Sequence, residues 1–300
     1  MTEFNILLYY YYTKIINTNE LWKQHKEFCS KYDLKGRIII AKEGLNGTLS
    51  GPTEDCDKYM NFIKNNPLFT DIEFKIDTYH KHVFPKMSIK IKEEIIKIGE
   101  DVDPTIKTGI HLTPCEFKKK MRETESIIVD MRSDYEYKVG KFKNALTFDI
   151  DKMYRFPDKF ENHQLFNDNN KDKAILTYCT GGIKCEKASS YFLSKGFKNV
   201  YQLHGGIIKY GFEENGEDFD GKCYVFDNRI TKEVNTVNPC IISKCYICDD
   251  LCDIMINCMN TVCNRHTTIC KECYENMGYC CSIKCKNSIK KIDQYPEYYM

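Results

Sequence analysis

The chain has 300 residues, 42% hydrophobic and 13% aromatic, so it can fill more than one hydrophobic core and is not a disordered protein. Its 44 Lys and Arg residues nearly balance 43 Asp and Glu residues, which excludes nucleic-acid binding through bulk positive charge alone. The longest apolar run, Ile6 to Tyr12, is far shorter than the roughly 20 residues that cross a bilayer, and the first residues do not have the pattern of a secretory signal. We therefore expect a multidomain cytoplasmic protein without membrane contact.

Residues 1–100 alternate between strand and helix periods, which predicts an α+β domain. The segment NILLYYYY is typical of a strand, and residues 17–33 have the helical period after an Asn-Thr cap. We expect a turn at Gly44-Leu45-Asn46-Gly47 between two further strands, a second helix capped by Thr53, and strands in IEFKIDTYHKH and MSIKIKEEIIKI. This order favours a ferredoxin-like (acylphosphatase-like) fold, with one antiparallel sheet under two helices.

Residues 101–114 form a break that contains Pro and Asp, and a second domain is predicted at residues 113–215. A helix is expected after Thr113-Pro114, and helical stretches separate the strand-like segments ESIIVDMR, ALTFDI, AILTYC and NVYQLHGG. Strands that alternate with helices predict a parallel α/β sheet. Residues 213–238 are interpreted as a connector to a cysteine-rich module at 240–287, and residues 288–300 as a flexible tail.

The second domain contains a cysteine loop between a strand and a helix: Cys179, Thr180, Gly181, Gly182, Ile183, Lys184 and Cys185. Free amides and the helix dipole favour an anion at such a loop, so we expect a stabilised Cys179 thiolate with a lowered pKa and a positive charge from Lys184 at the rim. The two cysteines could instead be small apolar fillers. A phosphatase loop is disfavoured, because Cys185 stands where an arginine would have to clamp phosphate.

Eleven of the 17 cysteines lie between Cys240 and Cys285, a density typical of metal ligation in a reducing compartment. Ten of them include two C-x2-C pairs and provide ligands for two four-thiolate zinc sites, with two to spare: Cys245, Cys248, Cys252, Cys258, Cys263, Cys270, Cys273, Cys280, Cys281 and Cys285. We expect about two structural zinc ions. Spacing does not fix the pairing, an iron–sulfur cluster is an alternative, and His266 could replace one cysteine or lie on the surface.

These regions together resemble the TrhO-type tRNA uridine hydroxylases. The segment YCTGGIKCEKAS, with VDMRSDYEYKVGKFKNA before it and VYQLHGGIIKYG after it, is similar to the family's rhodanese pattern CTGGIRCEKA. The segment LKGRIIIAKEGLNGTLSG is similar to the family's GRILIAEEGINGTVSG, and the cysteine array repeats the family's spacing, so the resemblance covers residues 4 to about 285. It implies a ferredoxin-like domain, a rhodanese domain and a zinc-binding module.

By position, the resemblance makes Cys179 the catalytic cysteine and Asp130 and Arg132 supporting residues. Lys184 stands where the family usually has arginine, which could weaken the planar recognition of an anion or a base. For Arg132, a salt bridge to Glu136 or a neighbouring carboxylate is as plausible as direct substrate contact. Asp130, at a strand end, is expected to be structural.

The resemblance implies oxygen-dependent hydroxylation of the wobble uridine of tRNA to 5-hydroxyuridine, with Cys179 as a direct nucleophile or as a persulfide carrier. The sequence has no flavin, haem or nicotinamide motif. The alternatives are a thiosulfate or persulfide sulfurtransferase and a zinc-stabilised binding scaffold with a vestigial loop. Candidate RNA contacts, which could equally be solvated charged faces, are Lys86, Lys90, Lys92, Lys118, Lys119, Lys120 and Arg122.

Overall fold

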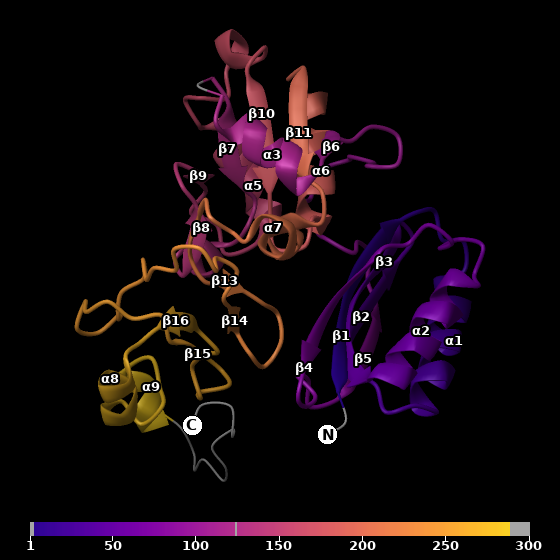
Figure 1. The fold of residues 1–300 in the computed structure, drawn as a ribbon, viewed down its shortest axis with the longest axis horizontal. Coiled ribbons are helices and arrows are strands. Elements are labelled where there is room, and N and C mark those ends of the chain that lie inside the picture. Colours follow the sequence, from indigo (N-terminus) through magenta and orange to yellow (C-terminus); the bar gives the residue numbers. More distant parts are fainter. Residues whose placement is uncertain (1–2, 124, 289–300) are drawn as a thin grey trace.

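The computed structural model describes residues 3–123 and 125–288, and its secondary structure follows the chain in three consecutive regions (Figure 1). The tail predicted at residues 288–300 lies outside the described residues except for Ser288, the last residue of α9 (Ile283–Ser288). Among the described helices, none is long and apolar enough to cross a membrane.

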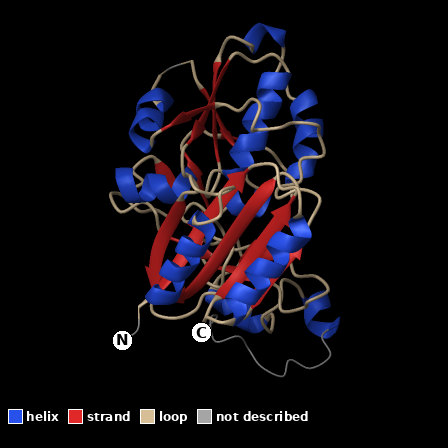
Figure 2. Cartoon of the chain, turned by 90° about the vertical axis from the view of Figure 1, so that its right-hand side faces the viewer, coloured by secondary structure: helices blue, strands red, loops and turns tan. Residues whose placement is uncertain are grey.

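The N-terminal region is a five-stranded sheet with two helices on one face (Figure 2). The strand order is β4-β1-β3-β2-β5. In chain order the elements are β1 (Phe4–Tyr12), α1 (Thr18–Ser30), β2 (Lys35–Ala41), β3 (Gly44–Pro52), α2 (Thr53–Lys64), β4 (Phe74–Tyr79) and β5 (Met87–Ile91). The acylphosphatase-like α+β fold predicted from the alternating periods is confirmed.

Three local predictions for this region are wrong. Strand β5 pairs with β2 in parallel, so the sheet is mixed rather than antiparallel. Strands β2 and β3 are joined at residues 42–43, and the expected turn at 44–47 lies within β3. Glycine is needed at Gly44 because β1 passes so close that a Cβ would lie 2.1 Å from the Tyr11 carbonyl oxygen. Thr53 is the first residue of α2 rather than its cap, and its hydroxyl donates to the Glu3 carbonyl.

Side chains of this sheet alternate between two faces, as the period of two requires. One face forms a core under α1 and α2 and includes Leu7, Tyr9, Ile38, Ile40, Leu45 and Leu49. The alternate residues of the same three strands line a cavity on the other face: Leu8, Tyr10, Arg37, Ile39, Asn46 and Thr48. The face without helices is therefore available for a functional site.

The central region contains a parallel sheet, as predicted, and its strand order is β6-β11-β10-β7-β9. Strand β6 was not predicted from the sequence. Its three residues lie within the predicted break at 101–114 and are too few to show the alternating pattern of a strand. The elements are β6 (Ile110–Leu112), α3 (Pro114–Met121), β7 (Ile127–Asp130), α4 (Asp134–Tyr137), β8 (Gly140–Phe142), β9 (Leu146–Thr147), η1 (Met153–Arg155), α5 (Phe156–Glu161), η2 (Asp168–Asn170), β10 (Ala174–Tyr178), α6 (Ile183–Ser194), β11 (Asn199–Leu203) and α7 (Gly206–Glu214).

The connector predicted at residues 213–238 is folded against the central region. Strand β12 (Phe219–Gly221) pairs with β8, and β13 (Cys223–Tyr224) pairs with β14 (Thr231–Lys232). The cysteine-rich segment follows with β15 (Met255–Asn257), β16 (His266–Thr268), α8 (Lys271–Asn276) and α9. Met255 packs with Val139, Tyr224 and Ile230, so the β15–β16 hairpin is attached to the central region by an apolar contact.

Candidate active site and metal centres

Cys179 lies at the carboxyl end of β10, where the chain turns into α6. Gly182 has a left-handed φ of +103°, and a Cβ at that position would lie 2.8 Å from the Tyr10 hydroxyl oxygen. A Cβ at Gly181 would lie equally close to a Leu8 methyl carbon. The two glycines therefore allow the loop to pack against the N-terminal sheet, and the Gly182 amide donates to Cys179 Sγ at 3.1 Å.

The electrostatics of the loop favour a thiolate at Cys179. Burial by itself would raise the pKa of this thiol, but a hydrogen bond from Cys185, the charge of Lys184 and the amides of Lys184 and Gly182 outweigh it and lower the pKa to about 6. Burial, together with the negative charge of its neighbour, raises the pKa of Cys185 well above its usual value. At neutral pH the loop therefore holds one thiolate beside one thiol.

Lys184 is held by a carboxylate instead of extending freely from the rim. Its Nζ is paired with Glu136 Oε2 at 2.5 Å, and Glu136 is fully buried. The same carboxylate oxygen accepts a hydrogen bond from the Ser133 amide, while the Thr180 hydroxyl lies 3.4 Å from the other oxygen. Glu136 thus fixes both Lys184 and the start of the loop. The sequence does not reveal the Glu136–Lys184 contact, because the two residues are 48 positions apart.

Asp130 and Arg132 form a fully buried ion pair beneath the loop. Asp130 accepts from the Arg132 backbone amide, Nε and Nη2, and also from the Tyr178 hydroxyl at 2.6 Å. Arg132 further donates to the carbonyl oxygens of Glu136 and Gly140. Neither side chain lines the cavity, so the geometry favours the structural alternative for both residues.

A cavity of about 810 Å³ lies over the loop, between the open face of the N-terminal sheet and the central region. Cys179, Thr180, Gly181, Ile183 and Lys184 contribute to its wall, whereas Gly182 and Cys185 do not. The rest of the wall includes aromatic and basic side chains, namely Tyr10, Phe84, Tyr135, Tyr154, Phe226, Arg37, Lys92, Lys97 and Lys152, and also the acidic Glu93, Glu94 and Asp151. Because basic side chains outnumber acidic ones in this wall, it suits a planar, anionic ligand.

Helix α6 connects the loop to the N-terminal region through buried polar contacts. Glu186 accepts from the Tyr10 hydroxyl and is also bonded by Gln202 and His111. Lys187, only 1% exposed, pairs with Glu43 and Glu94 of the N-terminal region. The sequence analysis did not predict a role for these residues, and their only signal was an adjacent pair of opposite charges, Glu186 and Lys187, on a helix that is mostly small or apolar after Lys184.

The predicted basic residues fall into two groups. On α3, three of the four are neutralised by acidic residues: Lys118 by Glu214 and Glu217, Lys120 by Glu123, and Arg122 by Glu217 and Asp218. None of the four lines the cavity of the Cys179 loop. On and beside β5, Lys86 and Lys90 are exposed, and Lys92 lines that cavity.

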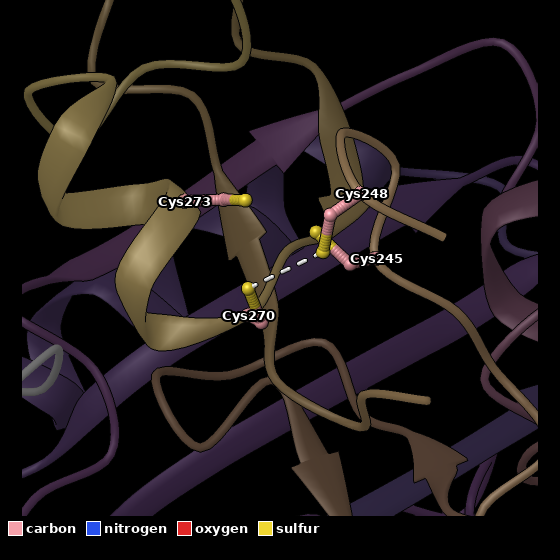
Figure 3. A group of neighbouring side chains, drawn as sticks. All are labelled: Cys245, Cys248, Cys270 and Cys273. Carbon is pink, nitrogen blue, oxygen red and sulfur yellow. Dashed lines mark hydrogen bonds between the residues drawn. The ribbon is translucent and has the colours of Figure 1, made fainter. Parts of the chain in front are cut away.

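The C-terminal cysteines form two groups of four, each with all four sulfur atoms within 4.8 Å of one another. One group is Cys245, Cys248, Cys270 and Cys273, whose sulfurs face a common centre (Figure 3). The other is Cys258, Cys263, Cys281 and Cys285. A tetrahedral zinc with bonds of about 2.3 Å requires sulfurs about 3.8 Å apart, and three of the sulfur pairs lie at 3.7 Å. The donor sets therefore fit zinc.

Two of the ten candidate ligands, Cys252 and Cys280, lie outside both groups and are buried. His266 also lies outside them. It is half-buried, with its ring stacked on Tyr135, rather than being a metal ligand or an isolated surface residue. The C-x2-C pairs thus belong to one quartet and the wider spacings to the other.

We expect iodoacetamide to alkylate Cys179 at a rate that rises with pH around a midpoint near 6, because only the thiolate reacts. Lys184→Gln should move this midpoint upward, since a nearby positive charge is lost, whereas Lys119→Gln should leave it unchanged. Mass spectrometry of the labelled peptide at each pH measures both effects. A wild-type midpoint at the ordinary thiol pKa, about 8.5, would contradict a stabilised thiolate.

Comparison with known protein families assigns all three regions of the chain. Residues 4–95 match the UPF0176 acylphosphatase-like domain, residues 113–211 match the rhodanese-like domain, and residues 220–286 match the rhodanese C-terminal region. The three matches occur in the order expected from the sequence resemblance.

Three of the similar proteins share one name. A tRNA uridine(34) hydroxylase from Cytophaga hutchinsonii is 51% identical over 244 residues, which cover 81% of this chain and 77% of that protein. Proteins of the same name from Bacillus velezensis and Streptococcus suis are 45% and 43% identical, and each match covers 81% of this chain and 76% of the relative. The resemblance stated from the sequence is confirmed: the chain belongs to the tRNA uridine(34) hydroxylase family.

Proposed function

We propose that this chain hydroxylates uridine 34 of tRNA at its 5-position, with the Cys179 thiolate as nucleophile and molecular oxygen as co-substrate. The observation that carries the proposal is the position of Cys179, a low-pKa thiol in the wall of an aromatic and basic cavity, in a member of this family. A uridine at position 34 is unpaired in the anticodon loop, so it can enter a cavity without the cost of opening a duplex.

In the proposed reaction the thiolate adds to C6 of the uracil ring and makes C5 electron-rich, so that C5 can accept oxygen. Loss of the C5 proton and expulsion of the Cys179 thiolate from C6 then restore the C5–C6 double bond of the ring. The loop assists this last step, because the donors that stabilise the free thiolate, namely Cys185, Lys184 and the Gly182 amide, also make it a good leaving group. One oxygen atom enters the base, and a reductant must supply two electrons to convert the other to water.

A second candidate function rests on the same loop. A thiolate in a cradle of amides can also carry a sulfane sulfur, so a persulfide on Cys179 would support sulfurtransferase activity. The aromatic wall favours the hydroxylase, because a small inorganic sulfur donor does not need several flat apolar surfaces. A scaffold with a vestigial loop is disfavoured by the intact thiol and its lowered pKa.

Nucleoside mass spectrometry of tRNA from cells with and without this chain tests the function. We expect 5-hydroxyuridine only when the chain is present, complete loss with Cys179→Ala, and a partial loss with Cys185→Ser, because a serine hydroxyl can still donate to the thiolate. Hydroxylation by Cys179→Ala would refute the nucleophile. Sulfur transfer from thiosulfate, without any 5-hydroxyuridine, would favour the second candidate.

The cavity also gives the tRNA backbone a place to bind. Arg37, Lys92 and Lys152 line it and have no carboxylate partner among the ion pairs of the described residues, in contrast to most of the α3 cations. Unpaired cations can neutralise phosphates without first breaking an ion pair. We call Arg37, Lys92 and Lys152 the rim cations of the cavity, and we propose that the anticodon loop binds over them and not on α3.

Replacing one rim cation, Lys92→Gln, should weaken tRNA binding several-fold, because one phosphate contact is lost. The slope of log affinity against log salt concentration should fall by roughly 0.7–0.9. Lys119→Gln, which removes an equal charge from α3, is the matched control and should change neither quantity. Filter binding across a salt series measures both. Equal losses in the two variants would argue against a specific rim contact.

We further propose that each cysteine quartet binds one zinc ion and that these ions have a structural role in a segment with a small core of its own. Metal analysis should then find about two zinc ions per chain, and Cys270→Ser should lose one or both, whereas the control Cys252→Ser should keep both. Iron with acid-labile sulfide would contradict this assignment. Because none of the 17 cysteines, all within the described residues, is in a disulfide, we expect the protein to act in the reducing cytoplasm.

A further inference from the structure

We infer that His266 is a positioning residue for the reaction: it fixes the ring of Tyr135 as a flat wall of the substrate cavity, on which the target base stacks. The inference rests on the proposed function, because it gives that cavity a specific base-binding surface. It also assigns the cysteine-rich segment a role in substrate binding in addition to its own folding.

The contact between the two rings is direct. The centroids of His266 and Tyr135 lie 4.7 Å apart with an interplanar angle of 25°, a stacked arrangement. Tyr135 lines the cavity and His266 does not, so His266 contacts Tyr135 from outside the cavity lining. Tyr135 is half-buried and also packs on the cluster of Val139, Tyr224, Ile230 and Met255, and the part of its ring that lines the cavity is the surface assigned to the base.

The orientation of His266 is itself fixed. Its Nδ1 shares a hydrogen bond of 3.0 Å with the Tyr224 hydroxyl, and the Tyr224 ring packs edge-on against both Tyr135 and Phe226. Phe226 is a second aromatic residue of the cavity wall. Burial lowers the pKa of His266, so its ring is neutral at neutral pH and acts through packing rather than charge.

The two cysteine quartets hold the hairpin that carries this histidine. His266 begins β16 and pairs with Asn257 of β15. Cys258 directly follows β15 and Cys263 lies in the loop of the hairpin, both in one quartet, while Cys270 of the other quartet lies just beyond β16. The two quartets therefore hold the hairpin at both ends, and this fixes the position of the His266 ring against Tyr135.

The test measures the affinity of an anticodon stem–loop carrying unmodified uridine 34, with all variants in a Cys179→Ala background so that no reaction occurs. His266→Ala should weaken binding roughly 3- to 10-fold, because the unsupported Tyr135 ring no longer presents one flat face. His266→Phe keeps a ring against Tyr135 and should restore most of the affinity. His163→Ala, which removes a half-buried ring packed on Phe148 and Phe166 away from the cavity, should have no effect.

In the background with an intact Cys179, His266→Ala should raise KM for tRNA by a similar factor and leave kcat within about 2-fold, with unchanged zinc content and an unchanged alkylation midpoint of Cys179. Equal affinities of wild type and His266→Ala would overturn the inference, as would a failure of His266→Phe to rescue binding. A wild-type protein that binds the stem–loop but makes no 5-hydroxyuridine would refute the proposed function and leave this inference standing. The affinity measurements in the Cys179→Ala background test base binding at Tyr135 independently of the reaction.

Discussion

The buried ion pair between Asp130 and Arg132 is the constraint on which the site depends. Asp130 ends β7, and through the Tyr178 hydroxyl it is tied to the residue immediately before Cys179. Arg132 donates to the carbonyl of Glu136 in α4 and to that of Gly140 at the start of β8, so it sets the position of Glu136 and hence of Lys184. Burying two charges is costly, and removing either partner would typically cost about 3–5 kcal/mol. Here neither residue has a buried side-chain nitrogen or oxygen without a hydrogen-bond partner. A single pair therefore holds together two strand ends, the Cys179 loop and the position of its Lys184 charge.

The N-terminal sheet supplies the other half of the cavity, and its alternating pattern gives each strand two roles. Every second side chain holds the sheet to its helices, and the residues between them form the cavity wall. The sheet can approach the loop closely because Gly181 and Gly182 leave room for Leu8 and Tyr10. Buried charges of α6 then fix the relative position of the two regions, since Lys187 has its carboxylate partners only in the docked arrangement.

The elements and the lowered pKa of Cys179 could be predicted because their signals are local. Alternating periods indicated the strands and helices, and the order strand, glycine loop, helix indicated an activated Cys179. Partners could not be predicted, because they depend on how distant segments meet. The α3 cations looked available until Glu214, Glu217 and Asp218 were placed beside them. His266 was expected either to replace one cysteine or to lie on the surface, because nothing near it in sequence indicates the Tyr135 ring.

The cysteine quartets alternate along the chain, with Cys245 and Cys248 joined to Cys270 and Cys273 across the first two ligands of the other quartet. A metal ion bound at each quartet, as proposed, would therefore close a loop that contains half of the other quartet's ligands. Losing either ion would release a loop and increase the conformational freedom of the other site, so the two occupancies would be thermodynamically coupled. Partial depletion of the proposed zinc would then disfavour singly loaded molecules, and the loaded fraction would depend on the zinc concentration more steeply than it does for two independent sites.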